Sequence, residues 1–221
     1  MTIKALIPVR SGSQRVKNKN IAPFAGTNLL KIKIKQLLRI PELDGVVVNS
    51  NSDEMLEIAR SLGAETVKRD EYFATSSVAI SEVYENMAQN MDCDTILFAD
   101  ATNPLLKDET IHRAINLYNN FQDEYDSVMT ATPVKLFMYY EGKPINYTED
   151  KKPRSQDLPN ILALNSALHI LPRILMEKKK SIVGYKPYLL PIDRVEATDI
   201  DDQIDFDFAE FMYKKEQDNA N

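Results

Sequence analysis

The chain has 221 residues, which is enough to bury a sizeable core in a single α/β domain. Hydrophobic residues make up 43% and charged residues 27%, as in soluble globular proteins, and no apolar run approaches the roughly 20 residues of a membrane span. Its single cysteine, Cys93, excludes an intramolecular disulfide, and with only two histidines the chain cannot assemble a Cys/His zinc site. We therefore expect a cytoplasmic protein with no membrane partner, and structural roles for His112 and His169.

The net charge of −6 conceals an uneven distribution along the chain. Residues 1–41 contain nine lysines and arginines and no acidic residue, whereas the rest of the chain holds 18 basic and 33 acidic residues. A nucleic-acid footprint would need a larger basic face without this excess of acid, so we expect no nucleic-acid partner. A small phosphorylated ligand, bound with a metal ion at the basic end, fits the distribution better.

A basic loop directly follows the first predicted strand. The apolar run 5–7 ends at Pro8 and indicates a buried strand of a parallel sheet. The loop then presents small residues at 11–13 and three cations within 15–19, so backbone N–H groups and positive side chains can surround one anion. It has neither the Gly-Lys-Ser/Thr of a Walker loop nor the three glycines of a dinucleotide fingerprint. We predict a polyphosphate site of another kind; a basic surface loop is the alternative.

Alternating strands and helices continue through the first half of the chain. The expected strands are 44–50, 65–68 and 95–99, and the expected helices are 29–38, one capped by Ser52 and ended by Gly63, one at 76–90 with cap candidates at 75–77, and one around 111–118. This βαβ pattern indicates a Rossmann-like, mostly parallel sheet flanked by helices. Ligands bind beyond the carboxyl ends of such strands, so the loops after Pro8 and after Ala99 can face one pocket.

The pattern changes in the second half of the chain. The expected elements are a strand at 127–132, a hairpin from 135–140 and 144–147, an irregular segment at 148–160, strands at 162–171 and 188–192, a helix from Pro172 and a last helix at 204–215. The last helix is expected to pack through Phe208, Phe211 and Met212. We predict a single domain over residues 1–221, with an insertion at about 135–160.

Two aspartates near the carboxyl end of the chain are candidate metal ligands. Residues two apart in an extended segment point the same way, so Asp199 and Asp201 can present two carboxylates to one spot while Ile200 enters the core. Magnesium takes oxygen ligands and usually joins one or two carboxylates to substrate phosphates. An acidic cluster favoured by the dipole of the last helix is the alternative.

Three motifs spread over nearly the whole chain belong together. They are Pro-x-Arg-Ser-Gly-Ser with a later Lys-Asn at 8–20, Pro-Arg-Ser-Gln-Asp-Leu-Pro at 153–159, and Asp-Ile-Asp with Asp-Phe and Ala-Glu at 199–210. In combination they resemble the acylneuraminate cytidylyltransferase family, the CMP-sialic acid synthetases, with its pseudaminic and legionaminic acid branches. The resemblance implies a nucleotide-diphospho-sugar transferase fold, Mg²⁺ as cofactor, and transfer of CMP from CTP to a 2-keto-3-deoxy sugar acid with release of pyrophosphate.

The resemblance also implies roles for individual residues. The nucleotide would be bound by Arg10, Ser11, Gly12, Ser13, Lys19, Asn20 and Arg69, and catalysis would rest on Arg10, Lys19 and Asp201. The metal would be held by Asp199 and Asp201, and the acceptor sugar by Asp100, Thr102 and Asn165. For Asn165, bonding to neighbouring groups within its own strand is the alternative. No protein nucleophile is needed, because positioning and charge neutralisation carry most of such a transfer.

Two places depart from the family's pattern. Gln14 and Arg15 stand where the family frequently has Lys-Gly, and Asp100 replaces a neutral amide beside the acceptor. A carboxylate at position 100 would repel the acceptor's own carboxylate unless it faces a hydroxyl, an amine or the metal. We therefore expect an acceptor with a hydrogen-bond donor near Asp100, and N-acetylneuraminic acid as a poor substrate. A nucleotidyltransferase for another sugar or sugar phosphate and an inactive nucleotide-binding homologue are the alternatives.

The resemblance further implies that the insertion at 135–160 is a dimerisation arm. Its apolar side chains would leave an exposed patch on a hairpin too small to bury them, namely Tyr139, Tyr140, Ile145 and Tyr147. We therefore expect a homodimer formed through this segment.

Overall fold

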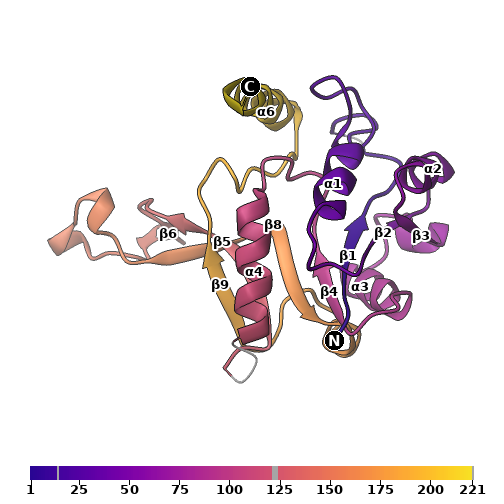
Figure 1. Cartoon of the computed structure of the whole chain (residues 1–221). Coiled ribbons are helices and arrows are strands. Elements are labelled where there is room, and N and C mark those ends of the chain that lie inside the picture. The colour runs from indigo at the N-terminus through magenta and orange to yellow at the C-terminus, as the bar shows by residue number, and fades with distance from the viewer. Residues whose placement is uncertain (14, 121–123, 221) are drawn as a thin grey trace.

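Seven strands form one mixed sheet in a computed structural model that describes residues 1–13, 15–120 and 124–220, so that Gln14 lies outside the described residues. The sheet order is β3-β2-β1-β4-β8-β5-β9. The strands are β1 (Ile3–Pro8), β2 (Gly45–Ser50), β3 (Glu65–Lys68), β4 (Thr95–Phe98), β5 (Ser127–Val134), β8 (Ile161–Pro172) and β9 (Pro187–Pro191). Strand β8 is antiparallel to β4 and β5, and the other neighbours are parallel. The predicted Rossmann-like, mostly parallel sheet is confirmed (Figure 1).

Helices cover both faces of this sheet. They are α1 (Leu29–Leu38), α2 (Asp53–Ser61), α3 (Ile80–Gln89), α4 (Asp108–Asn120), α5 (Arg173–Lys179) and α6 (Gln203–Ala220). Alternate residues of β1 point to opposite faces, so Ala5 and Ile7 pack with α1, α2, α4 and α6, while Leu6 packs with α3 and α5. Within the described residues, none of the helices is long and apolar enough to cross a bilayer. Strand β1 is therefore buried on both sides, and its carboxyl end emerges at the middle of one edge of the sheet.

The start of α3 differs from the prediction. Ser52 does cap α2, accepting a hydrogen bond of 3.4 Å from the backbone of Met55. Helix α3, however, begins only at Ile80, after Ala79, and no side chain caps it. A 3₁₀ turn, η1 (Glu71–Ala74), capped by Asp70, occupies the chain just before, and residues 75–77 follow it in a non-helical connection. The hydroxyl of Thr75, one of the expected caps of α3, instead donates to the carbonyl of Tyr72 at 3.0 Å and lies 3.0 Å from the hydroxyl of Ser77.

The last helix buries a different face from the one expected. Phe206 and Ala209 are buried, whereas Phe208 is 44% exposed and Phe211 is 63% exposed. The ring of Phe206 packs edge-on against Phe24 with a centroid distance of 5.3 Å, and this contact fixes the rotation of α6. The predicted packing through Phe208 and Phe211 is therefore wrong, while Met212 is partly buried against the core as expected.

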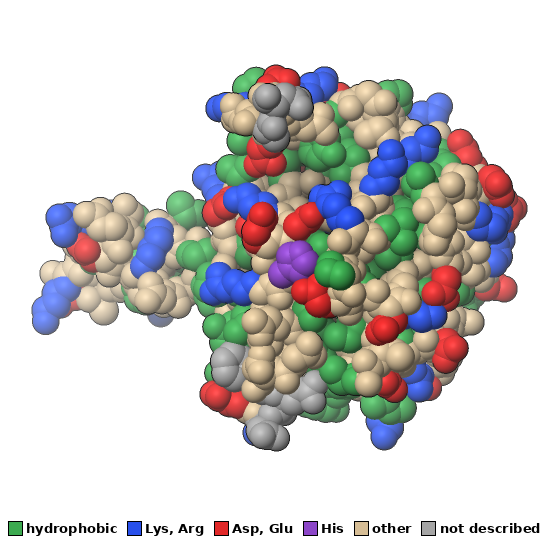
Figure 2. Space-filling model, viewed as in Figure 1, with side chains coloured by type: hydrophobic (Ala, Val, Ile, Leu, Met, Phe, Trp, Pro, Cys, Tyr) green, Lys and Arg blue, Asp and Glu red, His purple; other side chains and the backbone are tan. Residues whose placement is uncertain are grey.

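Residues 135–160 lie outside the seven-stranded sheet and project from it as an arm (Figures 1 and 2). The hairpin within the arm is shorter than expected, with β6 (Tyr139–Tyr140) paired to β7 (Lys143–Pro144). Two 3₁₀ turns follow, η2 (Glu149–Lys151) and η3 (Ser155–Asp157), so the segment expected to be irregular contains only short turns. Large apolar side chains are exposed along the arm, namely Leu136, Phe137, Tyr139, Tyr140 and Ile145.

Candidate active site

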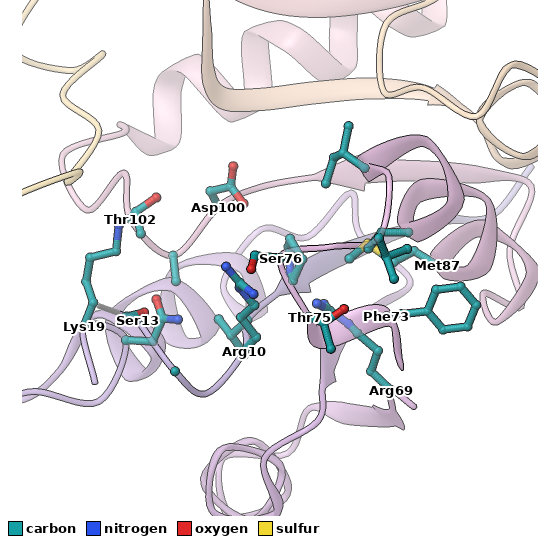
Figure 3. Close-up of a pocket in the computed structure, with 18 of the residues that line it drawn as sticks. Arg10, Ser13, Lys19, Arg69, Phe73, Thr75, Ser76, Met87, Asp100 and Thr102 are labelled. Atoms are coloured by element: carbon teal, nitrogen blue, oxygen red, sulfur yellow. The ribbon is translucent and has the colours of Figure 1, made fainter. Parts of the chain in front are cut away.

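A cavity of about 850 Å³ lies beyond the carboxyl ends of β1 and β4 (Figure 3). Four parts of the chain line it: the basic loop at 8–20, the segment 69–78 after β3, the face of α3, and residues 100–102 after β4. Asp201 closes it from the carboxyl end of the chain. The loops after Pro8 and after Ala99 therefore do face one pocket, as the parallel sheet required. Of the predicted site residues, those that line the cavity are Arg10, Gly12, Ser13, Lys19, Asn20, Arg69, Asp100, Thr102 and Asp201.

The first part of the basic loop is shaped by a glycine and anchored by a serine. Gly12 has φ of +83°, a conformation that residues with a Cβ rarely adopt. The Ser11 backbone N–H donates to Oδ1 of Asn51 at 3.1 Å, and Nδ2 of Asn51 donates to the Ser11 hydroxyl at 2.9 Å. Ser11 thus ties the loop to the end of β2 and does not line the cavity. Its predicted contact with the nucleotide stays a prediction.

Two guanidinium groups approach the cavity from different strands. Arg10 follows β1 and donates from Nη1 to the carbonyl of Ala74 at 2.5 Å, while buried Arg69 follows β3 and donates from Nε to Oδ1 of Asn49 at 2.6 Å. Burial, and then the positive charge of Arg10, lower the pKa of Arg69 to about 10. Neither guanidinium forms an ion pair with any described carboxylate, so both can act on an anion.

The middle of the basic loop meets residues 196–207, which are rich in aspartate and are called the acidic segment below. Arg15 Nη2 lies 2.8 Å from Oδ1 of Asp201, and the ammonium of Lys19 donates to the carbonyl of Ile200. Ile200 is fully buried, as predicted, and its N–H donates to the carbonyl of Thr102 at 3.0 Å. Residues separated by most of the chain therefore form one cluster of opposite charges at the mouth of the cavity.

Asp199 offers a carboxylate oxygen with no partner. Its Oδ1 is buried and accepts no hydrogen bond from any described residue, which is costly for an ionised group. Burial raises the pKa of Asp199, and the hydroxyl of Thr102 opposes this effect. Within the described residues, no cluster of three or more His, Cys, Asp or Glu side chains is arranged to hold a metal. The unsatisfied oxygen fits a hard cation that takes its remaining ligands from substrate phosphates and water.

Asp100 lines the cavity close to the charges of the loop and the acidic segment. Burial, and then the charge of Asp199, raise the pKa of Asp100 to about 7, while Lys33 and Lys19 oppose the rise. A carboxyl group with this pKa exists in both protonation states near neutral pH. It can therefore donate or accept a hydrogen bond at the wall of the cavity.

Asn20 and Asn165 have different surroundings. Asn20 lines the cavity, and its buried Oδ1 has no hydrogen-bond partner among the described residues, so it is available to a ligand. Asn165 does not line the cavity: it is bonded to Thr130 and Thr132 across the β5–β8 pair, at 2.5 and 2.9 Å. These bonds match the alternative of a strand asparagine satisfied by its neighbours, and its sugar contact stays a prediction.

The cavity also has a lobe that sequence reasoning missed. It is lined by Phe73, Thr75 and Ser76, which lie between β3 and α3, and by Tyr84 and Met87 of α3. Figure 3 labels four of these residues, namely Phe73, Thr75, Ser76 and Met87. Helical spacing alone cannot separate a core face from a pocket wall, so the apolar residues of α3 do not reveal this part of the cavity in the sequence. The hydroxyl run at 75–77 was a usable signal, since polar residues after a strand and before a helix lie at the binding edge of such a sheet.

The chain is similar to known proteins along most of its length. The family model described as cytidylyltransferase matches residues 4–183. The post-translational flagellin modification protein B of Campylobacter coli is 26% identical over 226 residues, covering 96% of this chain and 95% of that protein. A pseudaminic acid cytidylyltransferase of Campylobacter jejuni is 27% identical over 228 residues and covers 97% of both chains.

A solved structure shows the same fold. It is a CMP:2-keto-3-deoxy-manno-octonic acid synthetase in complex with CTP, and it superposes with a TM-score of 0.75 over 98% of this chain and 100% of that one, at 10% identity. Cytidylyltransferases generally use a divalent metal, and the unsatisfied oxygen of Asp199 agrees with such an ion. The family match spans most of the sequence and includes the basic loop and the segment after β4. The chain therefore belongs to the cytidylyltransferase family.

Proposed function

We propose that the protein transfers CMP from CTP to a 2-keto-3-deoxy sugar acid and releases pyrophosphate. The observation that carries this proposal is the meeting of Arg10 and Lys19 with Asp201 around one cavity that also contains Asp100. The cations of this cavity suit a triphosphate, and its carboxylates suit a metal and a polyhydroxylated acceptor. The relatives named for pseudaminic acid support a sialic-acid-like acceptor. We expect the reaction to take place in the cytoplasm, where CTP is made.

In this proposal the residues of the basic loop bind and orient the triphosphate. Arg10, Arg69 and the backbone N–H groups at 12–13 would hold its phosphates, and Lys19 would neutralise charge that develops on the leaving pyrophosphate. Asp199 and Asp201 would hold Mg²⁺, which supplies further charge neutralisation when bound. Asn20 would accept a hydrogen bond from the base or the ribose.

The chemical step is a displacement at phosphorus. The anomeric hydroxyl oxygen of the acceptor forms a bond to the α-phosphorus of CTP, the bond from that phosphorus to the bridging oxygen of pyrophosphate breaks, and the hydroxyl proton passes to solvent. Thr102 and Asp100 lie at the cavity wall where the acceptor would bind. In its ionised form, Asp100 suits a hydroxyl or amine donor better than a second carboxylate.

The test is a direct assay for the product. The protein is incubated with each of the four nucleoside triphosphates, Mg²⁺ and a mixture of keto-deoxy sugar acids and sugar 1-phosphates, and any nucleotide-sugar is identified by mass spectrometry. We expect a CMP-sugar acid formed from CTP alone. A nucleoside diphosphate sugar made from a sugar 1-phosphate would support the second kind of nucleotidyltransferase. Nucleotide binding without product would support an inactive homologue.

We also propose a homodimer formed through the arm at 135–160. The support is the exposure of its apolar side chains, with Leu136 70% and Tyr140 66% exposed. Aromatic and aliphatic groups collected on a projecting hairpin are typical of an interaction surface. In a symmetric contact with a second copy, the apolar surface of each arm would be removed from water.

A further inference from the structure

Lys33 of α1 is a fully buried lysine, with 0% of its surface exposed. Lysine is almost never buried to this extent unless its charge has partners. Its Nζ donates one hydrogen bond to Oε1 of Gln36 at 2.8 Å and another to the backbone carbonyl of Asn103 at 2.9 Å. Both acceptors are neutral, and Lys33 forms no ion pair with any described acidic residue. Lys33 is therefore an interior amino group held by two neutral dipoles, immediately behind the loop after β4.

That loop, residues 100–106, is named here the acceptor loop, and α1 holds it at two points. Lys33 bonds the carbonyl of Asn103, and Nε2 of Gln36 bonds the carbonyl of Leu106 at 2.5 Å. The acceptor loop in turn holds the acidic segment, because Nδ2 of Asn103 donates to the carbonyl of Thr198 at 3.0 Å. A chain of hydrogen bonds thus runs from Lys33 through the acceptor loop to the residue preceding Asp199.

The charge of Lys33 acts mainly on Asp100. Burial lowers the pKa of Lys33 to about 7, and among the charges that oppose this shift Asp100 has the largest effect. The other two acidic groups near Lys33 have partners of their own: Asp108 is 2.8 Å from Arg39, and Glu196 accepts the backbone N–H of Lys107 at 2.9 Å. Asp100 has no ion pair and no side-chain hydrogen bond with any described residue.

Three charged groups act on Asp100, and they lie in different places. Asp199 repels it, and Lys33 and Lys19 attract it. Lys19 lines the cavity, where bound phosphates would compete for its charge. Lys33 lies in the interior, where neither solvent nor substrate reaches it. Of the two side chains, Lys33 is the one that a bound nucleotide would not contact.

We propose that Lys33 is a positioning residue for the acceptor side of this reaction, which fixes the acceptor loop through Asn103 and supplies the buried positive charge that allows a carboxylate at position 100. The inference rests on the proposed function for its kinetic consequences, but the pairing of Lys33 with Asp100 is a property of the folded protein alone. A neutral residue at position 100 would not need this cation.

A double-mutant cycle tests the pairing without any assay of activity. Lys33→Met, Asp100→Asn and the double variant are compared by denaturant unfolding, with Lys35→Met on the exposed side of α1 as the matched control. We expect Lys33→Met to lower the midpoint, Asp100→Asn to recover most of that loss in the double variant, and the control to leave the midpoint unchanged. Additive effects of the two substitutions would overturn the pairing. Lys33→Gln, which keeps a donor but no charge, repeats the cycle if Lys33→Met does not fold.

Steady-state kinetics test the positioning role. We expect Lys33→Met to raise the KM for the sugar acid by about tenfold while the Kd for CTP, measured without acceptor, changes by less than about twofold, because none of the residues proposed to bind the nucleotide belongs to the acceptor loop. A general structural defect would weaken CTP binding to the same extent, and that result would overturn the role. If the wild-type protein makes no CMP-sugar from any acid, the proposed function fails, and the unfolding cycle still decides the pairing.

Discussion

The guanidinium of Arg15 lies 2.8 Å from the carboxylate of Asp201, across 186 positions of the sequence. Both side chains are more than half exposed, so this ion pair contributes little to the stability of the fold, on the order of 0 to 1 kcal/mol. The ion pair shows instead that the basic loop and the acidic segment meet at the mouth of the cavity, which both residues line. The charge of Asp201 therefore matters for the ligand more than for folding.

Replacing Asp201 separates these two effects. We expect Asp201→Asn to lower kcat by about 100-fold or more, because the metal and phosphates lose a charged ligand, while the melting temperature stays close to that of the wild type. The control is Asp207→Asn, an exposed carboxylate of α6 that bonds Gln203 and does not line the cavity. Near wild-type turnover of Asp201→Asn at limiting Mg²⁺ would show that the metal assignment is wrong.

Lys19 is expected to bind phosphate directly. Removing a charged hydrogen-bond donor costs about 1.5 to 3 kcal/mol, so Lys19→Ala should weaken CTP binding by about tenfold or more or abolish turnover. Titration calorimetry with CTP measures the affinity. Lys17→Ala is the matched control, since Lys17 is an exposed cation of the same loop that does not line the cavity. Equal affinities of the two variants for CTP would mean that Lys19 does not bind phosphate and that the loop is only a basic part of the surface.

Asp100 is expected to decide which sugar acid is accepted. With wild-type protein, we expect N-acetylneuraminic acid to have a lower kcat/KM than a related acid that presents a hydroxyl or amine donor near Asp100. Asp100→Gln removes the carboxylate and should raise kcat/KM for N-acetylneuraminic acid. A steady-state comparison over a panel of such acids gives the answer. The specificity argument fails if N-acetylneuraminic acid is already the best substrate and Asp100→Gln does not improve it.

His169 makes stability depend on pH. The imidazole is buried beside Phe98, and burial lowers its pKa from 6.5 to about 4. Because the unfolded chain binds the proton more readily, this group favours folding above pH 6.5, and the contribution is lost as the pH falls towards 4. The loss amounts to roughly 3 kcal/mol in the free energy of unfolding.

The comparison that isolates this effect uses His169→Asn, which cannot titrate in this range. Free energies of unfolding are measured by denaturant titration at several pH values between 4 and 7. The difference between wild type and variant should shrink or reverse towards pH 4. A difference that stays constant over this range would mean that His169 does not carry the effect.

The arm is expected to hold two copies together. Tyr140→Asp places a charge on its exposed hairpin and should convert a dimer into a monomer, as measured by light scattering at micromolar concentration. Tyr185→Asp, which alters another exposed tyrosine outside the arm, should leave the mass unchanged. A monomeric wild-type protein would remove the proposal of a dimer.

The parts of the site that the sequence predicts are local. The strand ending at Pro8, the small residues of the loop at 11–13 and the spacing of Asp199 and Asp201 depend on neighbouring residues, so pattern and backbone chemistry are sufficient to place them. Their convergence follows from the topology of a parallel sheet, in which carboxyl ends share one edge. Most of the fold and the outline of the cavity could be anticipated for this reason.

The features that sequence reasoning missed depend on distant contacts. Lys33 stands between Lys31 and Lys35 in a lysine-rich helix, where a lysine is expected to face solvent, and only the acceptor loop packed over it makes it an interior residue. The rotation of α6 depends on the contact of Phe206 with Phe24, far away in the sequence. Spacing alone cannot choose among Phe206, Phe208 and Phe211.

The hydrogen bonds of Lys33 and Asn103 give the cavity one rigid wall and one adjustable wall. Helix α1, the acceptor loop and the acidic segment are joined by a buried hydrogen bond from Lys33 and a partly buried one from Asn103. The middle of the basic loop reaches this body through the side chains of Arg15 and Lys19. On the proposed function, a bound triphosphate would compete with the acidic segment for the side chain of Lys19, while the hydrogen bonds of Lys33 and Asn103 behind the acceptor loop would stay in place.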